Sequence, residues 1–123
     1  MRTITTHQVN EVNDGLMIDV LDEAGHGGAC HEYLITTGEL GVEVQIRAEI
    51  NFQNGPIKEV GINGITHEAL LAILIDRLDG FQGGQYACAE NAAALNALRV
   101  AQSALQSRTA KRAARGVEGT HTV

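Results

Sequence analysis

A stretch of about thirty residues, 86–115, contains neither proline nor glycine and is rich in alanine. Such a stretch predicts one continuous helix about 45 Å long, at 1.5 Å per residue. A compact domain of 123 residues has a radius of gyration of only about 14 Å. We therefore expect this helix either to kink or to project beyond its own core, and we expect it to end at Gly116.

The apolar positions of this stretch recur at helical spacing, so one face of the helix needs a partner surface. These positions are Cys88, Ala92, Leu95, Leu98, Ala101 and Leu105. A second copy of the chain would provide such a surface. We therefore expect the protein to form a homo-oligomer.

The N-terminal half carries the pattern of a β-sheet. In residues 41–53, apolar side chains from Val42 to Phe52 alternate strictly with polar ones, which is typical of a strand with one wet face. A turn at Asn54-Gly55-Pro56 follows, and the apolar-polar segment 57–62 predicts a returning antiparallel strand. With two further strands predicted at residues 16–21 and 33–36, we expect an antiparallel sheet of at least four strands.

The pattern changes from strand to helix after residue 64. Thr66 is a predicted N-cap, Glu68 suits the first helical turn, and Asp79-Gly80 predicts the helix end. The sequence thus predicts an α+β fold within one structural domain. An antiparallel β-sheet region occupies residues 1–64, and a helical hairpin with a long, kinked C-terminal helix and a tail occupies residues 65–123.

Positive charge is concentrated at the C-terminal end of an acidic chain. The formal net charge is −6, but residues 1–90 hold four basic against fourteen acidic side chains, whereas residues 91–123 hold five against one. Arg108, Arg112 and Arg115 project from roughly one helix face. Two interpretations remain open: solvated cations placed favourably at a helix C-terminus, or a guanidinium clamp for phosphates.

Two residues around the bend between the helices could contact a nucleotide. Phe81 falls in the predicted glycine-rich loop, where the turn does not require a ring. It either folds back on Leu78 as an apolar plug or offers a stacking platform for a nucleobase. Asn91, one turn into the second helix, either faces solvent or hydrogen-bonds a base or ribose.

Other site types have little support. His26, Cys30 and His31 lack a second ligand cluster, so we expect no metal. The glycines at 25, 27 and 28 precede a strand rather than a helix and do not form a phosphate loop. We find no catalytic motif. Two distant cysteines and the absence of a signal-like N-terminus favour a cytoplasmic protein with free thiols, and the longest apolar run, residues 69–75, is too short to span a membrane.

Several uncommon strings occur together in one order. They are INFQNGPIKEVGINGITHEALLAILIDRL, GFQ, CAENAAAL and ARGVEGTHTV. With them, the chain from about residue 16 onward resembles the phage-encoded Thoeris anti-defence sponges. Its helical-hairpin and tail portion is similar to a wider group that includes the anti-CBASS sponges.

The resemblance implies a function without catalysis. Such sponges sequester the cyclic nucleotide alarm signal of the bacterial host and leave it intact, so no cofactor is implied and the site of action is the host cytoplasm. Their signal is a glycocyclic ADP-ribose isomer made by TIR-domain proteins, and some members also bind cyclic di- and trinucleotides. The resemblance further implies a β-region followed by a long kinked helix pair, assembled as dimers or, in some members, hexamers.

The site residues that the resemblance implies are Phe81 for stacking, Asn91 for the base, and Arg108 and Arg112 for the phosphates, with Arg115 and the Thr120 and Thr122 hydroxyls as weaker candidates. The chain has Ala89 where a basic residue often stands, so a second anionic ligand is less well supported. Two rival functions remain: a cyclic nucleotide phosphodiesterase, and a nucleic-acid-binding protein with a basic helix, which the net charge disfavours.

Overall fold

The chain divides into two compact units. The computed structural model describes residues 1–38 and 43–123. The first unit comprises residues 1–55 and 62–64, and the second comprises residues 56–61 and 65–123. We describe each unit by itself.

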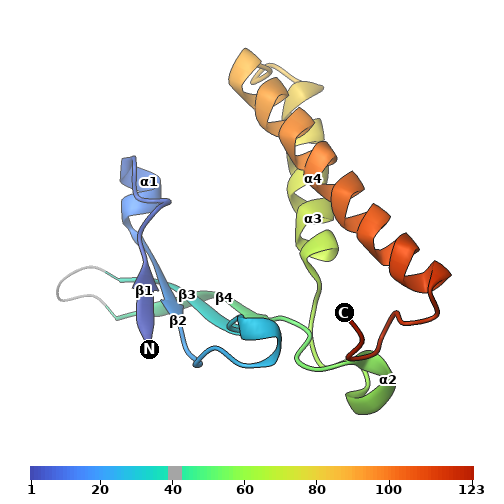
Figure 1. Cartoon of the computed structure of the whole chain (residues 1–123). Coiled ribbons are helices and arrows are strands. Elements are labelled where there is room, and N and C mark those ends of the chain that lie inside the picture. The colour runs from blue at the N-terminus through green and yellow to red at the C-terminus, as the bar shows by residue number, and fades with distance from the viewer. Residues whose placement is uncertain (39–42) are drawn as a thin grey trace. The chain divides into compact units, whose positions relative to one another are not determined.

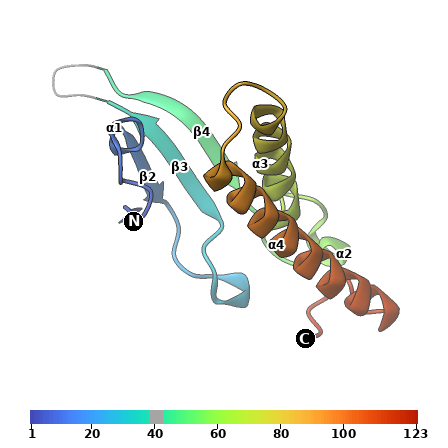
Figure 2. The same ribbon diagram turned by 90° about the horizontal axis from the view of Figure 1, so that it is seen from above.

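The first unit is a four-stranded antiparallel sheet (Figures 1 and 2). Its strands are β1 (Arg2–Ile4), β2 (Leu16–Val20), β3 (Glu32–Thr37) and β4 (Gln45–Asn51), in that order. The short helix α1 (Glu11–Asp14) joins β1 to β2, and the 3₁₀ turn η1 (His26–Gly28) joins β2 to β3. The α+β fold that the sequence predicts is confirmed.

Two of the segments that form or fail to form strands of the sheet differ from the prediction. Residues 57–62 do not form a returning strand, because Ile57–Val60 form the helical turn α2. Buried Pro56 has φ −67° and its carbonyl accepts hydrogen bonds from both Glu59 and Val60, which commits the segment to a turn. The fourth strand is instead β1, which pairs with β2 and whose three residues were too few to show a pattern in the sequence.

Strand β4 follows the predicted alternation only in its second half. Ala48 and Ile50 are half-buried and Glu49 is exposed, as a strand with one wet face requires. Ile46, however, is 60% exposed, so the sheet face under the start of β4 is not covered within the described part of this chain. Residues 41 and 42 of the predicted strand lie outside the described residues.

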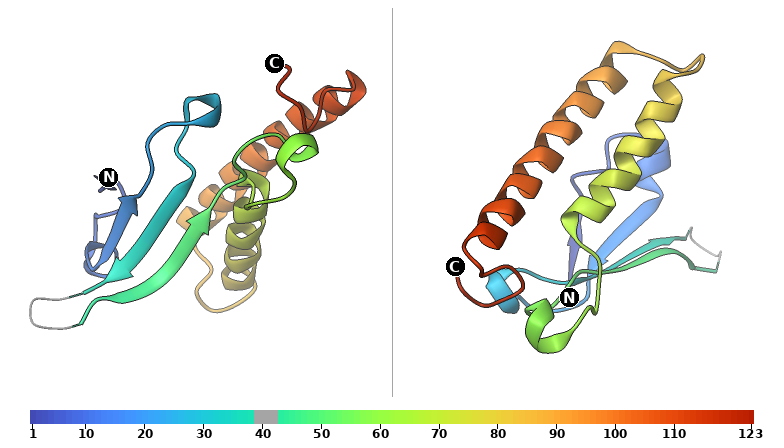
Figure 3. Two further views of the ribbon diagram at one scale, coloured as in Figure 1. Left: turned by 90° about the horizontal axis from the view of Figure 1, so that it is seen from below. Right: turned by 90° about the vertical axis from the view of Figure 1, so that its right-hand side faces the viewer.

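The second unit is built on a helical hairpin. Helices α3 (His67–Gln82) and α4 (Ala89–Ala114) lie side by side and are joined by the loop 83–88 (Figure 3). The predicted cap is confirmed, because the Thr66 hydroxyl accepts a hydrogen bond from the Ala69 N–H at 3.1 Å.

The predicted end of α3 at Asp79-Gly80 is wrong, because the helix continues to Gln82. The Asp79 carboxylate receives the Arg99 guanidinium at 2.7 Å, which holds this turn against α4. The Asp79 carbonyl accepts the Gly83 N–H at 3.1 Å, so the chain reverses one turn later, at Gly83 and Gly84.

Helix α4 begins three residues later than its predicted start and runs unbroken from Ala89 to Ala114, about 39 Å, without the expected kink. Cys88 caps it, since its Sγ accepts the Asn91 N–H at 3.4 Å, and the left-handed Gly116 follows it as predicted. Of its predicted apolar face, Leu95 is buried, Leu98, Ala101 and Leu105 are half-buried, and Cys88 and Ala92 are exposed. No helix in the described ranges is long and apolar enough to cross a membrane.

Apolar burial within the described chain is sparse. Val20 in the sheet and Leu95 in α4 are its buried hydrophobic residues. On the hairpin, Ile73 and Val100 are each 62% exposed. Because buried apolar area is the main source of folding free energy, a chain with this surface is expected to cover it against another molecule.

The Thr66 cap gives a direct test of how α3 begins. Thr66→Ala removes the acceptor for the Ala69 N–H and is expected to lower the free energy of unfolding by about 1 kcal/mol. Thr66→Ser keeps the hydroxyl and should leave stability close to the native value. Urea denaturation followed by circular dichroism measures both variants, and an equal loss in the two would contradict the capping role.

Candidate functional site

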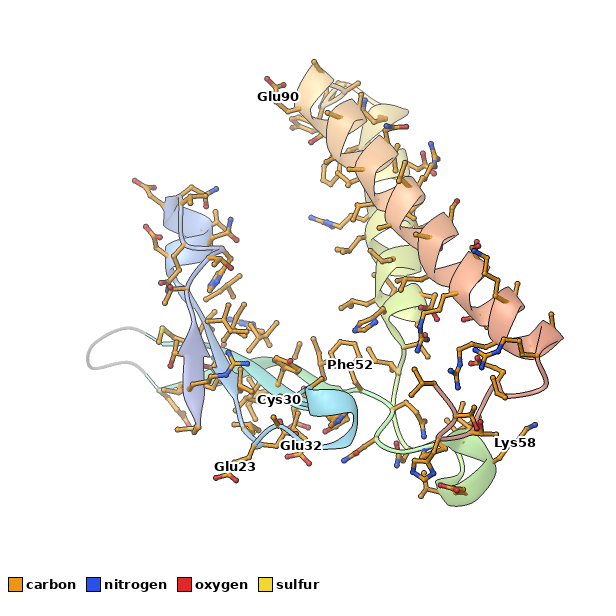
Figure 4. All side chains as sticks on the ribbon, viewed as in Figure 1. Glu23, Cys30, Glu32, Phe52, Lys58 and Glu90 are labelled. Carbon is orange, nitrogen blue, oxygen red and sulfur yellow. The ribbon has the colours of Figure 1, made fainter. Side chains whose placement is uncertain are left out.

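The six ligand-binding residues predicted from the sequence lie at the two ends of α4. Phe81 and Asn91 are at the end where the hairpin turns, which Glu90 marks in Figure 4. Arg108, Arg112, Arg115 and Thr120 are at or beyond the other end. Seventeen positions separate Asn91 from Arg108, which is about 25 Å along a helix. The structure therefore forms two clusters and does not bring the six residues together within one chain.

Phe81 occupies the last turn of α3, so its predicted position in a loop is wrong. Its half-buried ring contacts two residues that sequence analysis did not single out. The Arg77 guanidinium carbon lies 5.0 Å from the ring centroid, within cation–π distance. The Tyr86 ring lies 6.3 Å away at 75°, an edge-to-face arrangement.

A cavity of about 250 Å³ opens at this hairpin end. Its lining residues are Arg77, Gly80, Phe81, Gly84 and Tyr86. Arg77 and Phe81 lie four residues apart, so they share a helix face once α3 is known to continue past Gly80. The predicted helix end at Asp79-Gly80 left this relation out of the sequence prediction.

Side-chain hydrogen bonds hold the loop beneath this cavity. The Gln82 amide donates to the Cys88 carbonyl at 3.1 Å and accepts the Cys88 N–H at 3.0 Å. The Asn91 amide nitrogen donates to the Tyr86 carbonyl at 3.5 Å. Asn91 thus contacts the backbone that carries Tyr86.

At the other end of α4, Arg112 binds the C-terminal tail. Its guanidinium contacts the Glu118 carboxylate at 3.0 Å and donates to the carbonyls of Val117, Thr120 and Thr122 at 3.0, 3.2 and 2.6 Å. The side chain is only 13% exposed. Most of its donors are therefore satisfied by this chain, which is a third role beside the solvated cation and the phosphate clamp.

The tail has a second anchor on α2. The Lys58 N–H donates to the Gly119 carbonyl at 3.1 Å, and His121 contacts Glu59 at 2.9 Å. Figure 4 labels Lys58 on α2 beside the tail. The Thr120 hydroxyl donates to the Val117 carbonyl within the tail itself. Thr120 is therefore committed to a local turn.

Arg108 differs from Arg112 in its surroundings. Arg108 is exposed, and its side chain makes no hydrogen bond or ion pair with the described residues. Arg115 donates to the Val123 carbonyl at 2.9 Å. Lys111 is exposed on the same last turns. Of the three predicted arginines, Arg112 thus has the fewest donors available to an anion, Arg115 uses one of its donors on the tail, and the Arg108 guanidinium uses none within the described part of the chain.

In the sheet unit, the Asp22 carboxylate has a structural role. Burial raises the pKa of this carboxyl, but the N–H groups of Glu32 and His31, which donate to its oxygens at 3.0 and 2.8 Å, hold the pKa below its ordinary value. The Cys30 thiol lies 3.5 Å from the Asp22 carbonyl. No three His, Cys, Asp or Glu side chains in the described ranges gather so that they could hold a metal ion.

Two comparisons relate the chain to known proteins. The family model described as "Acb2/Tad1, hairpin domain" matches residues 44–110. The protein named Thoeris anti-defense 1, from Bacillus phage SBSphiJ7, is 50% identical over 74 residues, which are 60% of this chain and 52% of that protein. The chain thus spans about half the length of this relative.

The different surroundings of the two arginines predict different effects on stability. Arg112→Ala removes the donor that the Thr120 and Thr122 carbonyls and the Glu118 carboxylate share, and is expected to lower the free energy of unfolding by about 1–3 kcal/mol. Arg108→Ala, the matched control, should change it by less than about 0.5 kcal/mol. Urea denaturation gives both values, and hydrogen exchange should show faster exchange of the tail in the first variant alone. Equal effects in the two variants would contradict the role of Arg112 in holding the C-terminal tail.

Proposed function

Because the chain belongs to the Acb2/Tad1 hairpin family, we propose that it is a phage anti-defence protein that sequesters a cyclic ADP-ribose-type signal of Thoeris immunity. The ligand would be a glycocyclic ADP-ribose isomer, held intact and not degraded, in the cytoplasm of the host bacterium. The observation that carries the proposal is a pair of complementary clusters: aromatic residues where α3 turns into α4, and cationic residues near the C-terminal end of α4.

The two clusters match the two chemical parts of such a ligand. A cyclic ADP-ribose isomer has a flat base and a pyrophosphate. The ring of Phe81 would stack on the base, which contributes about 1–3 kcal/mol in comparable sites. The exposed guanidinium of Arg108 would pair with phosphate oxygens through charge-assisted hydrogen bonds.

A complete site needs two copies of the chain. The separation of about 25 Å along α4 is too large for one small ligand to contact both clusters of one chain. Two hairpins packed antiparallel would bring Phe81 and Asn91 of one copy to Arg108 of the other. The exposed Ile73 and Val100 provide apolar surface for such packing, and a two-fold arrangement would create two identical sites.

The proposed roles of the arginines follow their partners. Arg108 is the primary phosphate ligand because its donors are available. Arg112 would have to exchange the Glu118 carboxylate for a phosphate oxygen, so its main effect is to hold the tail, together with Thr120, beside the site. Arg115 extends the positive charge of the last turn.

Sequestration requires tight binding, because a sponge must hold its ligand below the concentration that activates the host effector. Nanomolar affinity corresponds to about 12 kcal/mol, which one exposed ion pair cannot supply. Stacking and several charge-assisted hydrogen bonds in a site closed by two subunits can supply this free energy. Cyclic di- and trinucleotides combine bases and phosphates in the same way and form a second ligand class for the same test.

Recovery of the ligand separates a sponge from an enzyme. We expect calorimetry to show saturable binding of glycocyclic ADP-ribose, and mass spectrometry to recover the intact molecule after the protein is denatured by heat. A consumed ligand would instead indicate a phosphodiesterase. Binding of duplex or single-stranded nucleic acid that weakens steeply with salt would indicate a nucleic-acid-binding protein.

A mixing experiment tests whether the site is shared. Phe81→Ala and Arg108→Glu are each expected to abolish ligand binding without changing the oligomeric mass. In a hybrid dimer of the two variants, one of the two sites keeps both native residues. Statistical mixing should therefore restore about one quarter of the wild-type binding capacity. No restoration after confirmed subunit exchange would place both residues in a site within one chain, and native affinity in either single variant would place the site elsewhere.

A further inference from the structure

Besides Phe81 and Gly84, the cavity at the hairpin end is lined by three residues that the proposed function does not yet use. They are Arg77, Gly80 and Tyr86. Phe81 contacts two of them, Arg77 and Tyr86. These residues either only support Phe81 or also contact a ligand in the cavity.

Gly80 is the most informative of the three. It lies inside α3, and its φ is not among the positive values that favour glycine. A Cβ built on it would meet no atom within 4 Å. Neither the backbone nor the packing of this chain therefore requires glycine, although alanine is the better helix former. Gly80 lines the cavity, so a side chain added there would project from its wall into open space.

Tyr86 adds a second ring to the cavity. It is 68% exposed, although the chain has only two tyrosines and two phenylalanines in all. Its ring meets Phe81 at 75°, so the two rings form a corner and do not stack on each other. A flat heterocycle in this corner could contact both rings at once, in stacked and edge-to-face geometry.

Arg77 brings positive charge to the same corner. Its guanidinium covers one face of the Phe81 ring at 5.0 Å, which orients the ring and leaves the exposed side chain able to pair with an anion. The nearby Asp79 carboxylate is occupied by Arg99 at 2.7 Å. The cluster thus combines two rings, one cation and an open helical backbone.

We propose that Arg77, Gly80 and Tyr86 form, with Phe81, a base-binding corner for a purine and its neighbouring phosphate: Tyr86 provides the second ring, Arg77 the cation, and Gly80 the open floor. This inference rests on the proposed function and deepens it. It assigns part of the phosphate recognition to the hairpin end, whereas the arginines near the C-terminus bind the remainder of the ligand.

The decisive variant is Gly80→Ala. The added methyl group fills the floor of the cavity while favouring the helix, so we expect an unchanged or higher melting temperature together with an affinity for glycocyclic ADP-ribose at least about tenfold weaker. The matched control is Gly15→Ala at the end of α1, where φ is −76° and a Cβ meets the Val12 carbonyl at an ordinary 3.7 Å. This control should bind the ligand like the wild type.

Two further variants separate the ring from the cation. Tyr86→Leu should weaken binding about tenfold, and Tyr86→Phe should retain it, because the ring and not the hydroxyl is used. Arg77→Gln should weaken binding and also make the affinity less sensitive to added salt, which loss of a merely structural contact would not do.

The outcomes distinguish this inference from the proposed function. Loss of affinity in Gly80→Ala and Tyr86→Leu, with retained folding and oligomeric mass, supports the base-binding corner. Native affinity in both variants, while Phe81→Ala fails to bind, overturns the corner and leaves the proposed function standing. A wild-type protein that binds neither glycocyclic ADP-ribose nor cyclic di- and trinucleotides overturns the proposed function, and the corner with it.

Discussion

The length of one unbroken helix controls the geometry of the C-terminal unit. Helix α4 runs from Ala89 to Ala114 without interruption; the aromatic pair of Phe81 and Tyr86 precedes its N-terminal end, and the cationic cluster lies near its C-terminal end. A helix is rigid on this scale, so the distance between the clusters is set by the number of residues between them. This constraint separates the predicted ligand-binding residues of one chain into two clusters.

The two ends of α4 are held in different ways. At the hairpin end, polar side chains fix a short loop: Gln82 bonds to both polar groups of the Cys88 backbone, and Arg99 pairs with Asp79. At the far end, Arg112 gathers the tail through its carbonyls and Glu118. A guanidinium is suited to binding several carbonyls and a carboxylate at once because the group is planar and always charged. Arg112 and Arg108, only four residues apart on α4, therefore have different surroundings.

Sparse apolar burial connects the fold to the proposed function. Few large side chains of the described chain are buried, and apolar residues lie exposed on both units. A single copy leaves this surface in water, which is unfavourable. Association of copies would cover the surface and bring the two kinds of half-site together, so one requirement for stability and one requirement for binding would be met by the same contact.

The sequence by itself determined the features that depend on neighbours a few residues away. These include the Thr66 cap, the Gly116 helix end, the long α4, the strands at β2, β3 and β4, and the positions of Asn91 and Arg108 along α4. Periodicity and capping record such local preferences directly. The resemblance to a sponge family rested on strings of this local kind.

Tertiary structure decided the features whose partners are distant or weakly patterned. Strand β1 exists because β2 pairs with it, α3 passes Asp79-Gly80 because Arg99 holds that turn, and Arg112 serves the tail because the tail folds back on it. Segment 57–60 forms a helical turn that the distant tail contacts, because the Lys58 N–H donates to the Gly119 carbonyl. Propensities leave such segments nearly balanced, so a single tertiary contact decides which structure forms.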